Sequence, residues 1–158
     1  MNDLDDEIPE PADFGPLSGT VSYGIKRAYL RVIRDLEASL SPLGFTPPLL
    51  AALSIVAATP GIAPARLAAA MGHGRSRAAP LLDHLEGQGL LERRAGPDRR
   101  SIGLHATAQG RTALRRLKPV VAEHEARITA SLSPAEAGAL PVLLERLAPD
   151  NWAGRESS

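Results

Sequence analysis

The sequence has no cysteine among its 158 residues. This absence excludes structural disulfides, thiol-based redox sensing and cysteine-bound zinc. No apolar run reaches the roughly 18 residues that a membrane-spanning helix requires. The first residues are acidic and lack the basic stretch followed by an apolar one that marks a secretory signal. We therefore expect a cytoplasmic protein with no membrane partner.

Motifs for catalysis and metal binding are also missing. Serine, histidine and aspartate are present, but none belongs to a nucleophile elbow, a glycine-rich phosphate loop or a pair of carboxylates. The histidines lie on different expected elements without the spacing of metal ligands, at His73, His84, His105 and His124. We expect no enzymatic activity, no cofactor and no metal, and we assign these histidines structural or surface roles.

The formal net charge is zero, but the charges are unevenly distributed. Residues 1–13 hold six acids and no base, whereas residues 66–118 hold eleven bases and four acids, a net charge of +7. Sixteen of the 18 bases are arginine, which binds guanine edges and phosphates with two hydrogen bonds. A GC-rich genome also enriches arginine, but that bias does not explain the clustering. The basic region is typical of a protein that binds nucleic acid.

Residues 93–105 have the pattern of two short strands joined by a turn. Gly96, Pro97 and Asp98 are residues that favour a turn, because proline presets its φ and glycine adopts positive φ at little cost. In the returning strand the residues alternate, which places three apolar side chains on one face: Ile102, Leu104 and Ala106. The arginines around the turn suit a β-ribbon that lies beside a phosphate backbone.

Apolar residues at three-to-four spacing predict a series of helices. They run over about 19–40, 47–58, 64–71, 75–86, 107–128 and 134–147. Thr46 and Thr107 are expected to cap two of these helices, and Ser133 with Glu136 forms a capping box. In the first helix, Asp35 is expected on the polar side, opposite the apolar stripe.

Two helices joined by a glycine-containing turn and followed by a hairpin give the order of a winged helix–turn–helix. The predicted fold class is mainly α with a small β-hairpin wing and terminal dimerisation helices. The terminal helices are expected to pack against a second copy; the alternative is that they fold back on their own subunit. The predicted divisions are an acidic tail (1–17), an N-terminal dimerisation helix (18–44), the DNA-binding lobe (45–106), C-terminal dimerisation helices (107–149) and a tail (150–158).

The order and spacing of these motifs resemble the MarR family of bacterial transcriptional regulators over about Ser22–Ala148. The resemblance is most specific from Gly89 through Asp98-Arg99-Arg100 to Arg111, and it extends to Leu43–Pro48, Leu67–Gly72 and Leu132–Glu136. It implies an obligate homodimer that binds a pseudo-palindromic operator in duplex DNA. It also implies repression as the usual outcome, and frequent release by a small, often aromatic, ligand.

The start of the helix over 75–86 is the predicted element for base recognition in the major groove. Arg75 and Arg77 are expected to contact guanine edges, with Ser76 and His73 as phosphate or base partners. The alternative is a solvated basic turn that contacts phosphates only.

The hairpin supplies the other predicted DNA contacts. Arg99, at its tip, is expected in the minor groove, whose negative potential attracts arginine. The resemblance implies that Asp98 and Arg100 brace the hairpin. Of Arg93 and Arg94, we expect one to reach a phosphate and the other to be solvated.

Two residues depart from the family's pattern. Ala63 stands where an N-capping serine or threonine is usual. Pro80 lies inside the predicted recognition helix, where it removes the hydrogen bond to the Ser76 carbonyl at a cost of about 3 kcal/mol or more. The helix therefore either begins nearer Ala78 or kinks at Pro80. A further interpretation takes Pro80 to mean that specific DNA binding has been lost, which leaves a dimeric interaction module.

The resemblance places the effector site between the dimerisation helices and the winged-helix lobe. Candidate residues there are Tyr23, Arg27, Tyr29 and Arg31, together with Phe14 or Phe45. In this hypothesis Tyr29 holds an aromatic ring and Arg31 a carboxylate, of an aromatic acid or acyl-CoA ligand. The alternative is that Tyr29 is a core residue of the apolar stripe.

Overall fold

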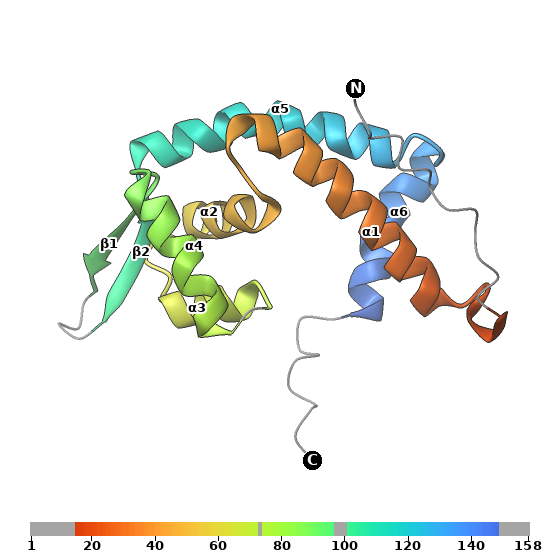
Figure 1. Ribbon diagram of the computed structural model, residues 1–158, viewed down its shortest axis with the longest axis horizontal. Helices are drawn as coiled ribbons and strands as arrows, with labels where there is room; N and C mark the ends of the chain where they lie inside the picture. Colours follow the sequence, from red (N-terminus) through yellow and green to blue (C-terminus); the bar gives the residue numbers. More distant parts are fainter. Residues whose placement is uncertain (1–14, 73, 97–100, 149–158) are drawn as a thin grey trace, which may run out of the picture. The chain divides into compact units, whose positions relative to one another are not determined.

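The computed structural model describes residues 15–72, 74–96 and 101–148, apart from the side chain of Arg75. Within these ranges six α-helices, two short 3-10 helices and one pair of strands follow one another along the chain (Figure 1). Contacts divide the chain into two compact units, residues 1–34 and 35–158. The expected fold class, mainly helical with a small hairpin, is confirmed.

Helix α1 (Val21–Leu40) crosses the boundary between the two units. It follows a 3-10 turn, η1 (Gly15–Leu17), and the Thr20 hydroxyl donates to the Leu17 carbonyl at 2.9 Å just before α1 begins. The helix predicted for this region is confirmed. The apolar side chains of its first turns remain exposed, at 67% for Val21 and 61% for Tyr29.

Helices α2 (Pro47–Ala58) and α3 (Pro64–Ala70) begin where the sequence predicts. The Thr46 hydroxyl accepts a hydrogen bond from the Leu49 N–H at 3.5 Å, which caps α2 as expected. Helix α3 also begins with proline, but Ala63 makes no side-chain cap, as its side chain predicts. The start of α3 therefore depends on proline and on packing alone.

Helix α4 (Arg75–Gly87) runs through Pro80, so of the two predicted alternatives the start near Ala78 is wrong. Pro80 removes one backbone hydrogen bond, to the carbonyl of Ser76, close to the start of the helix. Ser76 is exposed, so water can satisfy its carbonyl. The N–H groups of Arg77 and Ala78 both bond to the Gly74 carbonyl, at 3.0 and 3.3 Å, and these bonds hold the first turn in place.

Strands β1 (Leu91–Ala95) and β2 (Ile102–Ala106) pair antiparallel. Leu91 lies opposite Ala106 at the base of the hairpin, and Ala95 lies opposite Ile102 at the end where the chain passes from β1 to β2. Leu104 and Ala106 are buried as the alternation predicts, but Ile102 keeps 50% of its surface exposed. The apolar face therefore reaches the core only in the lower half of the hairpin, and its outer end projects beyond the core.

The chain before α3 is tied to the base of the hairpin. The Gly61 N–H donates to the Leu104 carbonyl at 2.8 Å, and the Leu104 N–H donates to the Ile62 carbonyl at 3.0 Å. Gly103 packs directly on this segment, since a Cβ at that position would lie 3.0 Å from the Cα and carbonyl oxygen of Gly61. A larger residue at position 103 would therefore push the two segments apart.

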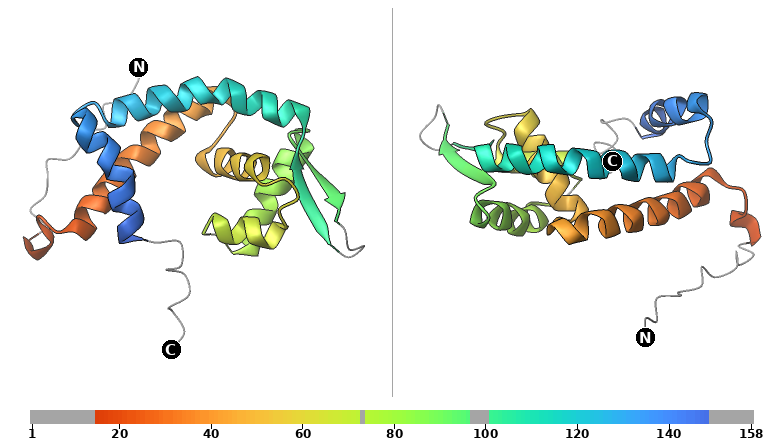
Figure 2. Two further views of the ribbon diagram at one scale, coloured as in Figure 1. Left: turned by 180° about the vertical axis from the view of Figure 1, so that it is seen from behind. Right: turned by 90° about the horizontal axis from the view of Figure 1, so that it is seen from above.

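The core of the second unit lies where α2, α3 and α4 gather beside the hairpin (Figures 1 and 2). Each of these elements contributes a fully buried leucine: Leu53, Leu67, Leu85, Leu91 and Leu104. Burying a side chain of this size stabilises the fold by about 1.5–3 kcal/mol. The core thereby fixes the orientation of α4 and the hairpin, which carry the predicted DNA contacts.

Helix α5 (Ala108–Ile128) starts against the segment that follows α4. The Thr107 hydroxyl accepts from the Gly110 N–H at 3.0 Å, as predicted for a cap, and donates to the Gly89 carbonyl at 2.6 Å. Gly110 lies so close to the Leu90 carbonyl oxygen that a Cβ would come within 2.1 Å of it. The direction of α5 is thus fixed by the end of the α4–β1 connection.

Helix α6 (Pro134–Leu147) begins with the predicted capping box. The Ser133 hydroxyl accepts from the Glu136 N–H at 3.3 Å, and the Glu136 carboxylate accepts from the Ser133 N–H at 2.8 Å. The large apolar side chains of α6 are exposed, at 41–55%: Leu140, Val142, Leu143, Leu144 and Leu147. A single chain therefore leaves the apolar face of this helix in water.

A test of length and composition finds no single helix in the described ranges that is suited to crossing a membrane. One bent pair of helices, over residues 21–43 and 47–58, passes that test when its members are taken together.

Candidate nucleic-acid interface

The first turn of α4 presents polar side chains to solvent. Ser76 and Arg77 are exposed, whereas Ala78, Leu82 and Leu85 form a buried stripe that anchors the helix. The N-cap residue is Gly74, which makes no side-chain bond to the helix. The positive end of the helix dipole is therefore open to an anion, and an exposed hydroxyl and guanidinium lie beside it.

Several predicted DNA contacts cannot be placed. His73, Asp98, Arg99 and Arg100 lie outside the described residues, and Arg75 is described by its backbone alone, as the first residue of α4. The roles assigned to these residues stay predictions.

The guanidinium of Arg93 joins the hairpin to α4. It donates to Asp83 at 2.8 Å and also forms an ion pair with Glu86, and both carboxylates lie on the same face of α4. The hydrogen bond to Asp83, together with the charges of both carboxylates, raises the pKa of Arg93 above its usual value. Arg93 was predicted from sequence only as a DNA contact or a solvated residue. Its carboxylate partners give it a bracing role that the sequence analysis missed.

Arg94, the next residue, points to a different partner. Its Nε donates to the Glu92 carboxylate at 2.9 Å, and its Nη2 pairs with the same oxygen. The Arg94 side chain is 60% exposed. Of the two neighbouring arginines, Arg94 is therefore the more accessible to an external anion.

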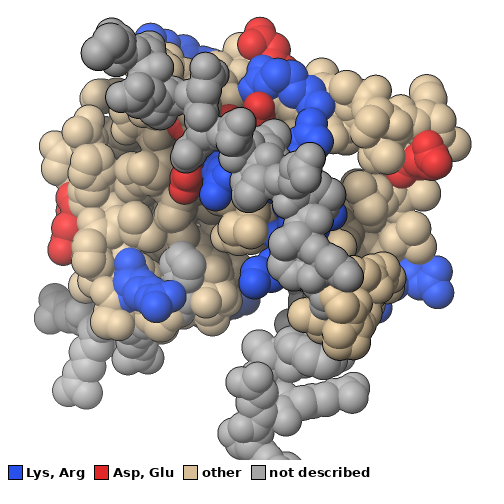
Figure 3. Space-filling model, turned by 45° about the vertical axis from the view of Figure 1, so that its right-hand side comes forward, with Lys and Arg blue, Asp and Glu red and all other residues tan. Residues whose placement is uncertain are grey.

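Positive charge extends beyond the recognition elements. On the face drawn in Figure 3, Lys and Arg side chains form several separate groups within a mainly uncharged surface. In the first half of α5, residues 108–122 include four bases and no acid: Arg111, Arg115, Arg116 and Lys118. A polyanion can therefore be attracted to more of the chain than α4 alone.

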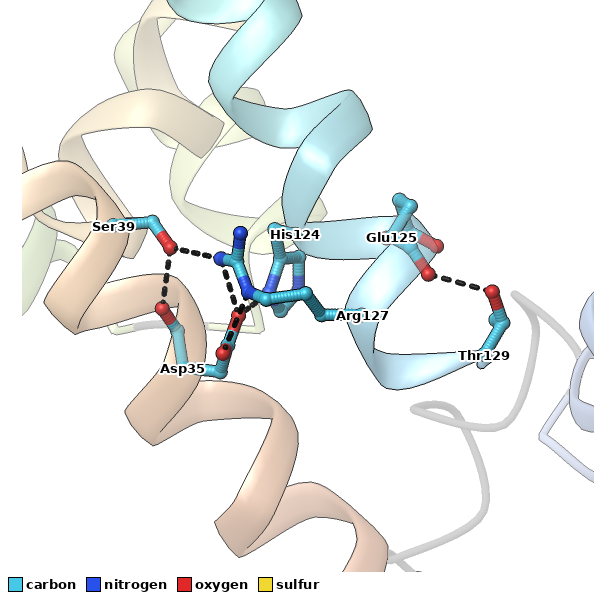
Figure 4. A network of polar contacts seen from close by, with 6 residues as sticks. All are labelled: Asp35, Ser39, His124, Glu125, Arg127 and Thr129. Atoms are coloured by element: carbon cyan, nitrogen blue, oxygen red, sulfur yellow. Dashed lines mark hydrogen bonds and ion pairs between the residues drawn. The ribbon is translucent and has the colours of Figure 1, made fainter. Parts of the chain in front are cut away.

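A polar cluster joins the end of α1 to α5 within the second unit (Figure 4). Asp35 contacts Nδ1 of His124 at 2.6 Å and accepts two hydrogen bonds from Arg127, at 3.1 and 2.8 Å. Arg127 also donates to the Ser39 hydroxyl at 2.6 Å. The expectation that Asp35 lies on the solvent side of α1 is wrong, because its carboxylate is the partner of a histidine and an arginine from α5.

These contacts favour the ionised form of Asp35. The hydrogen bond from Arg127 and the contact with His124 lower the pKa of Asp35 from 3.8 to about 2. The same carboxylate raises the pKa of Arg127 above its usual value. Asp35, His124 and Arg127 therefore hold the end of α1 to α5 through charged contacts. The sequence gives one indication of this cluster, which is that His124 occupies a position of the apolar stripe in α5. In the structure its side chain is 98% buried.

The four predicted effector residues lie on α1. Arg27, Tyr29 and Arg31 are exposed and Tyr23 is half-buried. On an α-helix, Tyr23, Arg27 and Arg31 share one side, whereas Tyr29 lies two residues from Arg31 and faces away from it. The hypothesis that Tyr29 holds an aromatic ring and Arg31 a carboxylate stays a prediction, with the two side chains on different sides of α1.

The histidines do not form a metal site in the described ranges. No group of three His, Asp or Glu side chains there is placed to hold a metal ion. His124 contacts Asp35, His105 is a half-buried residue of strand β2, and His84 is exposed.

Comparison of the sequence with known proteins gives consistent matches. A profile described as the MarR family matches residues 43–101. The proposed transcriptional regulatory protein for the hcr operon of Thauera aromatica is 34% identical over 135 residues, which cover 84% of this chain and 81% of the relative. An HTH-type transcriptional repressor of Mycobacterium tuberculosis is 32% identical over 117 residues, covering 73% and 84% respectively.

Solved structures give the same result. The transcriptional repressor CouR bound to a 23-mer DNA duplex is 38% identical with a TM-score of 0.79, over 85% of this chain and 96% of that chain. CouR bound to p-coumaroyl-CoA is 35% identical with a TM-score of 0.77, over 87% and 98%. A MarR family protein of Mycobacterium tuberculosis in complex with salicylic acid is 29% identical with a TM-score of 0.69, over 81% and 96%.

Proposed function

Because the chain belongs to the MarR family of transcriptional regulators, we propose that it represses transcription by binding an operator in duplex DNA as a homodimer. The observation that carries this proposal is the uncapped first turn of α4, which is fixed by the core and presents Ser76 and Arg77 to solvent. Support comes from CouR, a repressor of the same fold whose structure contains DNA. MarR proteins are not an enzyme family, and we propose that this one acts in the cytoplasm by binding alone.

The DNA contacts follow from the elements that carry them. Arg75 and Arg77 contact base edges in the major groove. Ser76, and His73 just before α4 in the sequence, each contact a phosphate or a base. Arg99 enters the minor groove, braced by Asp98 and Arg100. Arg93 positions the hairpin through Asp83 and Glu86, and Arg94 is the neighbour left to reach a phosphate.

The homodimer accounts for the apolar side chains that one chain leaves exposed. They occur in both compact units, on the first turns of α1 and along α6. Pairing would bury them, and two copies of α4 would then meet successive major grooves, about 34–36 Å apart. The predicted dimerisation segments, 18–44 and 107–149, contain these helices.

We further propose that an aromatic acid or its CoA thioester releases the DNA. Two similar proteins are solved with such molecules, CouR with p-coumaroyl-CoA and the mycobacterial protein with salicylic acid. In this chain Tyr23, Arg27 and Arg31 form one face of α1 that offers an aromatic ring and two cations, with Tyr29 on another face. A ligand releases DNA only by binding the non-DNA-binding arrangement more tightly.

Operator binding tests the proposal most directly. The full-length protein is titrated with the DNA upstream of its own gene and with a scrambled duplex of equal length. We expect Arg77→Ala to lower affinity for the operator about tenfold or more, since a bidentate guanine contact contributes about 1–3 kcal/mol of discrimination. The control is Arg116→Ala, on α5, which removes the same charge.

Pro80 supports the second candidate function, an interaction module without specific DNA binding, since it lies inside α4. That candidate predicts equal affinity for the operator and the scrambled duplex. Equal losses on both duplexes in Arg77→Ala would instead mean phosphate contact without base recognition.

A further inference from the structure

The end of α2 and the beginning of α5 lie beside β2 at the base of the hairpin (Figure 2). A small recess is found there. Its volume is about 70 Å³. Part of its lining is apolar and comes from the end of α2 and the turn that follows, at Val56, Ala57 and Pro60. The recess lies wholly within the second unit.

Three nitrogen-bearing side chains from three different elements line the same recess. They are Arg94 of β1, His105 of β2 and Arg111 of α5. Among the described residues no carboxylate lines it, although Glu92 pairs with Arg94 and lies opposite His105 in the strand register. Two guanidinium groups and one carboxylate leave this part of the surface positive.

These side chains keep hydrogen-bond donors that the structure does not use. Arg111 donates to the Ala106 carbonyl at 2.6 Å, and Arg94 uses its Nε and Nη2 on Glu92. A guanidinium has five N–H groups, so both retain donors. His105 is half-buried, and its imidazole makes no hydrogen bond within the described ranges. A neutral imidazole carries one N–H, so His105 can donate without an added proton.

We propose that this recess binds a phosphate group. A phosphate offers three or four oxygens to donors that come from three elements, whereas a carboxylate offers two. A bound phosphate would join β1, β2 and α5, and so hold the base of the hairpin against α5. The phosphate belongs either to a small molecule or to a DNA backbone. His105 and Arg111 are not among the predicted operator contacts, so the site adds to that set.

The test uses the full-length protein and inorganic phosphate at constant ionic strength, balanced with chloride. We expect phosphate to raise the thermal midpoint of wild type in a saturable way. His105→Asn and Arg111→Gln should each raise the half-saturating concentration at least tenfold. The matched control is Arg115→Gln, one turn further along α5, whose guanidinium bonds to Thr112 and does not line the recess. It should stay within twofold of wild type.

His105→Asn keeps the test decisive if Arg111→Gln fails to fold, because the His105 side chain makes no bond that the fold loses. A second measurement identifies the source of the phosphate. If DNA supplies it, Arg111→Gln reduces the slope of log affinity for DNA against log salt by about one, whereas His105→Asn, which removes a neutral donor, lowers DNA affinity at every salt concentration. If a small molecule supplies it, that slope is unchanged and inorganic phosphate binds.

Either source of the phosphate supports the proposal that the recess binds a phosphate group. The proposal is overturned if neither effect occurs, or if Arg115→Gln weakens phosphate binding as much as the two recess variants. The phosphate titration involves no DNA, so its failure is distinguishable from a failure of operator binding.

Discussion

The carboxylate of Asp35 lies 2.6 Å from Nδ1 of His124, although 89 residues separate them in the chain. The imidazole is 98% buried, and a buried nitrogen without a partner costs about 1–3 kcal/mol. The contact with Asp35 removes that cost. The same carboxylate accepts two hydrogen bonds from Arg127, so it holds the end of α1 to α5. Within the second unit, this contact therefore holds residues 35–40 of α1 to α5.

The first prediction concerns how the stabilising contacts of Asp35 with His124 and Arg127 depend on pH. The pKa of Asp35 is lowered from 3.8 to about 2, so the folded state favours the ionised carboxylate. Its stabilising effect is complete above about pH 4 and is lost as the pH falls toward 2. We therefore expect Asp35→Asn to be less stable than wild type at pH 6, with the difference shrinking between pH 4 and pH 2.

The measurement is thermal unfolding followed by circular dichroism, at one protein concentration because a dimer's midpoint depends on concentration. The control is Ser39→Ala, which removes the hydroxyl that Arg127 contacts but no titrating group. Its offset from wild type should be the same at every pH. Parallel curves for Asp35→Asn and wild type from pH 6 to pH 2 would contradict the prediction.

A second prediction separates helix propensity from packing. Alanine is favoured over glycine in a helix by about 1 kcal/mol, so propensity alone predicts that Gly110→Ala and Gly138→Ala both stabilise. At Gly110 a Cβ would lie 2.1 Å from the Leu90 carbonyl oxygen, whereas at Gly138 it meets no atom within 4 Å. We expect Gly110→Ala to destabilise by about 1–3 kcal/mol, as overpacking does, and Gly138→Ala to cause no loss.

Denaturant unfolding of both variants at the same protein concentration measures the difference. A stabilised Gly110→Ala would mean that the start of α5 is free to move away from Leu90. The bonds of Thr107 to Gly89 and to Gly110 would then not fix the direction of α5.

The sequence predicted the features of this fold that have local causes. The caps at Thr46, Thr107 and Ser133 depend on residues within three positions of each other, and all three are confirmed. The helix boundaries follow from these caps and from apolar spacing. The hairpin follows from turn residues and alternation, except that alternation does not tell how far the core extends. It therefore placed Ile102 on the apolar face without showing that half of this side chain is exposed.

Contacts between distant residues were not predictable in this way. Asp35 is a charged residue in an amphipathic helix, and such a residue is expected to face solvent. Nothing near it in the sequence indicates a contact with His124 or Arg127. Likewise, Asp83 and Glu86 entered the sequence analysis only as two of the four acids counted in residues 66–118. Their arrangement around Arg93 became visible only when the hairpin was placed beside α4.

A third prediction tests whether Arg93 braces the hairpin or contacts DNA. If Arg93 contacts a phosphate, Arg93→Gln reduces the slope of log DNA affinity against log salt by about one. If Arg93 instead braces the hairpin, its loss lowers DNA affinity at every salt concentration and leaves the slope unchanged. We expect the second result, with a loss of less than about 1 kcal/mol in stability because these ion pairs are largely exposed.

Asp83→Asn sharpens this test, because it removes a negative charge near the DNA. Pure electrostatics predicts tighter DNA binding, whereas loss of the brace predicts weaker binding. Arg94→Gln serves for comparison, since its exposed guanidinium is expected to reduce the salt slope. A reduced slope in Arg93→Gln alone would assign the phosphate contact to Arg93 instead.

A fourth prediction concerns the effector face of α1. Tyr23, Arg27 and Arg31 share one side of the helix, so we expect Arg27→Gln or Arg31→Gln to raise the concentration of aromatic acid or CoA thioester needed to release DNA. A tenfold increase is the expected scale for losing one charge-assisted hydrogen bond, of about 1.5–3 kcal/mol. Affinity for the operator without ligand should be unchanged. Lys26→Gln is the control, because Lys26 is exposed on α1 but lies about 100° around the helix from Arg27. An equal effect of Lys26→Gln would mean that general charge, not this face, is responsible.

The last prediction concerns the apolar face of α6. Leu140, Leu143 and Leu144 retain 41%, 55% and 46% exposure, and Leu140 and Leu143 also line a shallow recess of about 230 Å³. Three such side chains in water are unfavourable, and burial in a dimer would recover about 1.5–3 kcal/mol for each. We expect wild type to sediment at twice the 16.6 kDa chain mass at micromolar concentration, and Leu143→Glu to shift toward the monomer.

Glu145→Gln, on the same helix, should stay dimeric. If Leu143→Glu remains a dimer that binds the operator normally, α6 is not part of the interface. The apolar side chains at the start of α1 would then have to carry it.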